Sequence, residues 1–381
     1  MRKHFLSLIA VSLFLLSSCK KEQVNSIRLR WVKAHPSETW ADVQTGLLWS
    51  LSYMGAELDS SKLKELLVRE DSSHFILHLD QAGFTPKSLR SLSVICDSLR
   101  MSDEYEKTGC IDLGRFLLLS EHTSAHYYSI AGVAPTLQEY YRRHDLSRAK
   151  TFNLYTSGVA EHHRVIRFNV GPDYSSIAWL ALEGSGDIDS GTFRVEAYEA
   201  LDVMPNGQLR FAVYDSDGKL LPASPAHLGK AGKPSKCMWC HEIVVNPLFV
   251  VSPEPKQGIS IHEFGLWVDS SQHVIDRYRK SLHSLIDFSK RQDHTYGELL
   301  YISFMEPSSY RLANEWQLPL IEAEMKMHAF RTHPYKEFPF LGDCYYRYYA
   351  DSLSPYRSRE VPVSVREYYG KEPDYFSKDK K

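Results

Sequence analysis

The residues with the clearest chemical potential form one short motif, Cys237-Met238-Trp239-Cys240-His241. Two thiols three positions apart lie on the same side of a helical turn, so both can react with one bound group. The imidazole that follows them is a common metal ligand. The spacing therefore indicates a cofactor, redox or metal centre built on Cys237, Cys240 and His241, or on the thiol pair alone.

The motif resembles the Cys-x-x-Cys-His haem-attachment motif of c-type cytochromes. The resemblance implies that each thiol forms a thioether with a haem vinyl group and that His241 is the fixed axial ligand of the iron. It is limited to these five residues and a helical setting. The stretch before them, residues 221–236, is rich in turn residues, whereas small cytochromes have an amphipathic helix there. The expected cofactor is covalent haem c, and the expected role is one-electron transfer to a redox protein partner. The chain is then an electron carrier or a binding protein rather than a catalyst.

A second iron ligand is predicted from spacing. Met305 ends an expected helix just before Glu306-Pro307, and its thioether would raise the reduction potential relative to a second histidine. Rival ligands are His294, Met325, Met327 and His328.

Other uses of the thiol pair stay open. Cys237 and Cys240 could form a redox disulfide, although no βαβ pattern surrounds them to activate it. They could also bind structural zinc, with Cys344 or a distant histidine completing the site. In these alternatives the chain is a non-enzymatic envelope lipoprotein or binding module with a structural or redox-active Cys-x-x-Cys pair.

The first residues are typical of a protein made for export. Arg2 and Lys3 precede an apolar run, residues 5–16, and the chain then reads Leu16-Ser17-Ser18-Cys19 before it turns polar. This order indicates a signal peptide, and the run is shorter than the ~20 residues that span a bilayer.

The four residues ending at Cys19 resemble the lipobox of bacterial lipoproteins. The resemblance implies that residues 1–18 are removed and that Cys19 is lipidated, with residues 19–36 as a polar tether. We therefore expect a chain anchored by lipid to the inner or outer membrane of the cell envelope, facing the periplasm or the surface. Covalent haem attachment takes place outside the cytoplasm, so the lipobox and the Cys-x-x-Cys-His motif predict the same compartment.

Composition indicates a folded globular body. Hydrophobic residues make up 43% and charged residues 24% of the 381 residues, and removal of Arg2 and Lys3 with the leader changes the net charge from −2 to −4. No basic face is indicated, so a nucleic-acid partner is not expected. Among the remaining cysteines, Cys96 and Cys110 are close enough in sequence to pair, which would leave Cys344 alone.

The elements expected to position the motif give a multi-domain α+β fold. We expect a mixed α/β domain over residues 37–150, a small antiparallel β-rich domain over 151–228 and a mostly helical haem domain over 229–381. Periodicity predicts helices over residues 43–54, 62–68, 274–288, 296–305 and 319–330, and strands over 74–79, 127–133, 192–198 and 208–214.

The first domain carries a weaker resemblance. A helix over residues 42–55 followed by a strand at His126-Tyr127-Tyr128-Ser129-Ile130-Ala131-Gly132 is similar to the order in papain-like exported peptidases. That reaction needs a thiolate, and no cysteine lies between Cys19 and Cys96, so the resemblance implies an inactive relative. His122 and His126 lead into the expected strand, and we predict that both are solvated.

Overall fold

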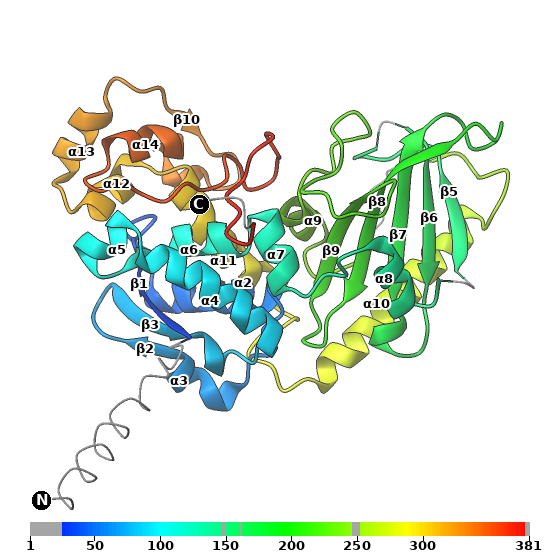
Figure 1. The fold of residues 1–381 in the computed structure, drawn as a ribbon, viewed down its shortest axis with the longest axis horizontal. Helices are drawn as coiled ribbons and strands as arrows, with labels where there is room; N and C mark the ends of the chain where they lie inside the picture. The colour runs from blue at the N-terminus through cyan, green and yellow to red at the C-terminus, as the bar shows by residue number, and fades with distance from the viewer. Residues whose placement is uncertain (1–24, 147–148, 161, 246–251, 378–381) are drawn as a thin grey trace, which may run out of the picture.

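The structure, a computed structural model, describes residues 25–146, 149–160, 162–245 and 252–377. The predicted signal peptide, the lipidation residue Cys19 and the first part of the tether lie outside the described residues. Figure 1 shows the N-terminal region and the last helices on one side of the molecule and a large twisted sheet on the other. The α+β fold class is confirmed, with a five-stranded antiparallel sheet and a C-terminal region rich in helices.

The N-terminal region is a small mixed sheet covered by helices. Its strands lie in the order β2-β3-β1-β4, with β1 antiparallel to β3 and parallel to β4. The helix predicted over 43–54 begins earlier, because the side chains of Thr39 and Asp42 form a capping box at its start. The elements are β1 (Ser26–Arg30), α2 (Trp40–Tyr53), α3 (Leu63–Leu66), β2 (Leu67–Arg69), β3 (His74–His78), α4 (Pro86–Arg100), α5 (Asp103–Thr108), β4 (Ile111–Asp112), α6 (Leu113–Ser120), α7 (Ser124–Ile130) and α8 (Leu137–Arg143).

The second sheet is an antiparallel meander whose five strands neighbour one another in chain order. The predicted hairpin is present, because Asn206-Gly207 turns the chain between β8 and β9 and Gly207 takes a φ of 83°. The strands are β5 (Lys150–Leu154), β6 (Arg164–Asn169), β7 (Ala178–Ser185), β8 (Arg194–Val203) and β9 (Leu209–Asp215).

The C-terminal helices do not pack as one unit. Helices α9 (Pro234–His241) and α10 (Ile261–Ser281) belong with the second sheet: α9 contacts β9, and Phe264 of α10 stacks on Phe152 at 4.1 Å between ring centres. Helix α11 (His294–Met305) instead packs between α2 and α6 in the N-terminal region. Gly46 permits this approach, because a Cβ there would lie 2.5 Å from the carbonyl carbon of Tyr296.

The last helices form a small core of their own around Leu312, Trp316 and Met327. Two short strands pair antiparallel beside them, and the tail from residue 354 runs back over the N-terminal region. The elements are α12 (Ser309–Trp316), α13 (Leu320–Met327), β10 (His333–Pro334), β11 (Asp343–Cys344) and α14 (Arg347–Leu353). The single-turn 3-10 helices among the described residues include η1 (Ser60–Lys62), η2 (Leu79–Gln81), η4 (Tyr174–Ser176), η5 (Arg291–Asp293) and η6 (Pro339–Leu341).

Several local predictions were wrong. The strand predicted over 127–133 is helix α7 and the turn after it, because Tyr127 and Ile130 pack from the helix into the core, which overrides their β propensity. The helix predicted over 62–68 stops at Leu66, where β2 begins to pair with β3. Helix α10 begins well before residue 274 and ends at Ser281. The proposed Cys96–Cys110 pair is not formed, and both thiols are free and buried.

Candidate functional site

Helix α9 presents the Cys-x-x-Cys-His motif, and its first turn is anchored to distant parts of the chain. Pro234 occupies the first turn, where a missing N–H costs nothing. The buried ammonium group of Lys233 donates to the carbonyl oxygens of His122 and Ser364 and pairs with Glu372. The helix ends at His241, because Glu242 takes a φ of 45°. The motif is therefore held between the N-terminal region and the C-terminal tail.

Cys237 and His241 lie four positions apart on α9, so they share one face of the helix. Both line a cavity between α9, the second sheet and α10. The His241 ring centre is 5.6 Å from that of Phe211 in β9. Cys240 is half-buried on the same helix and is not part of the cavity lining.

The walls of this cavity are predominantly apolar. Its volume is about 120 Å³, below the roughly 300–1,000 Å³ of most small-molecule sites. Two aromatic rings of the lining, Trp179 from β7 and Phe264 from α10, contact each other edge to face with ring centres 5.8 Å apart. The other apolar side chains of the lining are Leu154, Val159, Ile166, Ala181, Ala200, Leu201, Phe211, Ala212, Val245 and Val268.

One buried ionic group borders the cavity. The guanidinium of Arg164 pairs with Glu183 and lies 3.5 Å from a carboxylate oxygen of Glu199; Arg164 and Glu199 both line the cavity. Burial and the nearby Glu199 raise the pKa of Glu183 to about 8. One of the two carboxyl groups can therefore be protonated at neutral pH, and the guanidinium of Arg164 is then balanced by a single carboxylate.

The ring of His241 suits a metal ligand. Burial lowers the pKa of His241 to about 4, so the imidazole is neutral at pH 7. Its buried Nδ1 has no hydrogen-bond partner among the described residues. Burial also raises the pKa of Cys237 and of Cys240, so both thiols are protonated, unlike the activated thiolates of redox disulfide proteins.

The structure does not bring Met305 to His241. Met305 ends α11 as predicted, but it lines a different cavity with Glu306 and Tyr346. Among the rivals, His294 lies at the other end of α11 in a small polar pocket, Met327 is buried among the last helices, and Met325 and His328 are exposed. Within the described lining of the motif's cavity, His241 is the one imidazole or thioether.

Comparisons with protein-family models, with curated proteins and with solved structures found no match for this chain. Among the residues that the structure describes, no group of three His, Cys, Asp or Glu side chains is arranged to hold a metal ion, and no helix is long and apolar enough to cross a membrane.

The prediction that His122 and His126 are solvated was wrong. Both are buried, and His126 is fixed by hydrogen bonds to the carbonyl oxygen of Leu119 and from the backbone N–H of Tyr375. His122 instead lines the polar pocket that contains His294, on the other side of α9 from the apolar cavity. The one sequence signal for this pocket is the adjacent pair Glu121-His122, two ionisable residues that come directly after the apolar end of α6.

Proposed function

We propose that this chain is an exported, lipid-anchored monohaem protein similar to c-type cytochromes, with Cys237 and Cys240 as the attachment thiols and His241 as an iron ligand. The observation that carries the proposal is that Cys237 and His241 line the same apolar cavity. The signal peptide and Cys19 supply the compartment in which covalent haem attachment occurs.

The chemistry of the lining residues suits a haem in three respects, but the cavity, at about 120 Å³, must widen to admit the ring. Apolar walls would exclude water from the ring and keep the local dielectric low, which is one way a protein tunes a haem's potential. The neutral imidazole of His241 offers a lone pair to iron without first losing a proton. The guanidinium of Arg164 lies on the cavity lining and could donate to a haem propionate in place of Glu199, whose carboxylate is 3.5 Å away.

A haem bound there would supply one-electron chemistry, and the chain's own residues would bind it, shield it and set its potential. The proposal assigns the iron one protein ligand, His241, because Met305 lines another cavity. The electron partner would be a redox protein at the same membrane, reached by a body tethered through residues 19–36. An electron carrier or binding protein remains favoured over a catalyst.

A pyridine haemochrome spectrum tests this proposal. The full chain, expressed with a haem-maturation system, should give a red protein with the spectrum of covalent haem. Cys237→Ala should remove most of the covalent haem, and His241→Ala should leave haem attachable but change its ligation spectrum. Cys96→Ala is the matched control, because Cys96 is a buried free thiol on α4 away from the motif. If the wild-type chain is colourless, or if Cys237→Ala retains its haem, the proposal is wrong.

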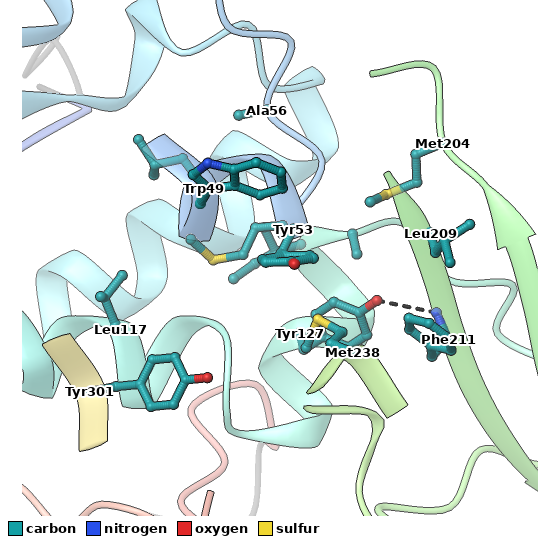
Figure 2. Packing of buried hydrophobic residues seen from close by; sticks show 14 of the residues in the cluster. Trp49, Tyr53, Ala56, Leu117, Tyr127, Met204, Leu209, Phe211, Met238 and Tyr301 are labelled. Carbon is teal, nitrogen blue, oxygen red and sulfur yellow. Dashed lines mark hydrogen bonds between the residues drawn. The ribbon is translucent and has the colours of Figure 1, made fainter. Parts of the chain in front are cut away.

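A second candidate is a lipid-anchored binding module in which α9 has a structural role. It is favoured by the two residues inside the motif, because Met238 is buried in the main core beside Tyr127 and Phe211 (Figure 2) and Trp239 lies under the guanidinium of Arg366 at 3.9 Å. Colourless, folded protein with free thiols would support this candidate. Met238→Ala should then destabilise the fold as strongly as other core truncations.

A further inference from the structure

The cavity that Met305 lines is a large groove between α14 and the C-terminal tail. The tail, red in Figure 1, passes beside α14 and contributes residues 360–364 and 369–373 to the lining. The volume of the groove is about 930 Å³, near the upper end of the roughly 300–1,000 Å³ of most small-molecule sites. The chain therefore has space for a ligand here without any movement of its elements.

Three exposed tyrosines line this groove, which we call the tyrosine groove. The exposed fraction is 44% for Tyr346 and 58% for Tyr348, at the start of α14, and 68% for Tyr369 of the tail. Val363, also in the lining, is 66% exposed. Large apolar side chains that gather on an open surface mark an interaction site. The groove should therefore bind a partner that covers these rings.

The two rings of α14 are held in place by neighbours. Tyr346 and Tyr348 are nearly parallel, with ring planes inclined by 14° and centres 5.8 Å apart. His333 stacks on Tyr346 at 4.4 Å between ring centres, and its Nε2 lies 2.6 Å from a carboxylate oxygen of Glu306. Tyr349 contacts the ring of Tyr348 at 4.1 Å between centres. Rings that are fixed in advance lose little freedom on binding, so they suit a rigid, flat ligand.

The charged side chains of the described lining already have partners within the chain. The ion pairs are Arg347 with Glu315 and Asp351, Lys371 with Glu360, Glu372 with Lys233, and Glu306 with His333. A charged ligand would have to displace one of these pairs, whereas an uncharged ligand would not. Each carboxylate still has lone pairs to accept further hydrogen bonds. The ligand should therefore be uncharged and rich in hydrogen-bond donors.

Sugars combine these properties. One face of a pyranose ring carries C–H groups that stack on an aromatic ring, and its hydroxyl groups donate to carboxylates. Proline-rich peptides also bind aromatic grooves, but proline has no N–H, so such a peptide brings mainly acceptors. The lining contains four carboxyl groups, which are acceptors as well, on Glu306, Asp351, Glu360 and Glu372. The lining therefore favours a sugar over a proline-rich peptide.

A second groove adjoins the tyrosine groove and extends it. The two share Glu360 and Pro373, and the second groove continues between the tail and helices α4 and α5 with a volume of about 870 Å³. Its lining there is polar, with Asp97, Ser98 and Asp103 among its residues. The two grooves together have space for a chain of several sugar units.

We propose that the tyrosine groove binds a neutral, N-acetylated oligosaccharide, whose sugar rings stack on Tyr346, Tyr348 and Tyr369 and whose hydroxyl groups donate to the carboxylates beside them. N-acetylation is favoured because the tail adds the apolar segment Val361-Pro362-Val363 to the lining, where acetamido methyl groups can make contact. The proposal goes beyond the haem assignment and does not depend on it.

Calorimetric titration of the full chain with the hexamer of β-1,4-linked N-acetylglucosamine tests the proposal. The hexamer should bind saturably and more tightly than the dimer, because the dimer cannot reach the second groove. Its affinity should be the same at low and high salt, since no charges pair on binding. The cationic glucosamine hexamer, which lacks the acetyl groups, and a decaproline peptide should bind more weakly.

Ring variants localise the binding. Tyr348→Ala and Tyr369→Ala should each weaken binding of the N-acetylglucosamine hexamer by about tenfold or more, and Tyr348→Phe should retain most of it because the ring is kept. Tyr296→Ala is the matched control, since this tyrosine of α11 is 37% exposed and lines neither groove. Thermal melts should show that all four variants are folded, because the replaced side chains are exposed.

Four results would overturn the proposal. They are no saturable binding of the N-acetylglucosamine hexamer to the wild type, unchanged binding by both Tyr348→Ala and Tyr369→Ala, tighter binding of the glucosamine hexamer, and tighter binding of decaproline. Colourless protein that binds the N-acetylglucosamine hexamer would end the haem proposal alone, and haem-containing protein that does not bind it would end this one alone.

Discussion

The imidazole of His241 and the phenyl ring of Phe211 have their centres 5.6 Å apart, with the planes inclined by 30°. This contact joins the end of α9 to strand β9 and closes one side of the apolar cavity. Phe211 is 4% exposed, so its ring packs in the core as well as against the histidine. The position of His241 therefore depends on the second sheet, not on α9 alone.

Truncation of Phe211 should show this dependence. Phe211→Ala should lower the free energy of unfolding by about 3–5 kcal/mol, the usual range for a buried phenylalanine. Phe211→Leu should cost about 1.5 kcal/mol or less. Urea denaturation of haem-free protein measures both, and equal stability of the alanine variant and the wild type would show that the ring is not packed as described.

The loss of folding stability at low pH should depend on Asp202 of β8. Arg210 donates two hydrogen bonds to its carboxylate at 2.8 and 2.9 Å, and Nε2 of His144 lies 2.8 Å from Oδ2. Burial alone would raise the pKa of Asp202, but Arg210 and His144 outweigh it and lower the pKa to about 2. Since the folded-state pKa is depressed, the stabilisation is present above about pH 4 and is lost as the pH falls towards 2.

Asp202→Asn therefore should cost about 2 kcal/mol at pH 7, and the difference from wild type should shrink between pH 4 and pH 2. The measurement is urea denaturation at a series of pH values. A difference that stays constant down to pH 2 would contradict the ion-pair assignment.

Glu121 should have the opposite effect to Asp202, because its ionisation should destabilise the folded chain as the pH rises. Its carboxyl group ionises near its ordinary pKa in the unfolded chain, whereas burial holds the folded-state pKa at about 8. Stability should therefore fall as the pH rises from about 4.5 to 8. Glu121→Gln should be more stable than wild type by roughly 4 kcal/mol at pH 8 and similar to it near pH 4.5. Thermal melts at the two pH values decide this, with no difference at pH 8 as the contrary outcome.

The close approach of α2 and α11 should make Gly46 intolerant of a side chain. The Cβ of an alanine there would meet the backbone of Tyr296 and Gly297, so Gly46→Ala should destabilise the fold by about 1–3 kcal/mol or more. Gly265, inside α10, has open space around it, because no atom of another element lies within 4 Å of where its Cβ would be. Gly265→Ala should stabilise by up to about 1 kcal/mol, because alanine is the better helix former. Equal effects of the two substitutions on denaturation midpoints would count against the described packing.

Met305 offers a test of the ligand set. If His241 is the one protein ligand of the iron, Met305→Leu should leave the absorption spectrum of the reduced protein unchanged and cost less than about 1.5 kcal/mol. Loss of a methionine-ligation band on this substitution would restore Met305 as an iron ligand and require a different arrangement of α11.

Local patterns predicted much of the fold. The alternation in β8 and β9 and the Asn206-Gly207 turn are read directly from neighbouring residues, and the structure contains that hairpin. Helix α7 shows where prediction from local patterns fails, because its tyrosines taken alone favour a strand. Their burial depends on strand β9, since the hydroxyl of Tyr127 accepts a hydrogen bond from the N–H of Phe211 (Figure 2). Long-range packing decided that segment.

Only part of the candidate site could be predicted, because local motifs can be read from the sequence and long-range packing cannot. The motif at residues 237–241 is local, so its chemistry could be inferred, whereas the sheet that walls its cavity lies up to about 80 residues earlier in the chain. Spacing alone could not place Met305, because α11 turns back to pack with α2. The polar pocket was missed altogether, since its carboxyl and imidazole groups come from segments more than 100 residues apart.

Peptide mass spectrometry of the full chain, expressed with a haem-maturation system and digested with protease, tests the haem assignment most directly. The peptide containing Cys237 and Cys240 should carry the mass of one haem and no free thiol, and the cysteine peptides of Cys96, Cys110 and Cys344 should be unmodified. Recovery of the Cys237–Cys240 peptide without haem, with its thiols free or joined as a disulfide, would contradict the assignment.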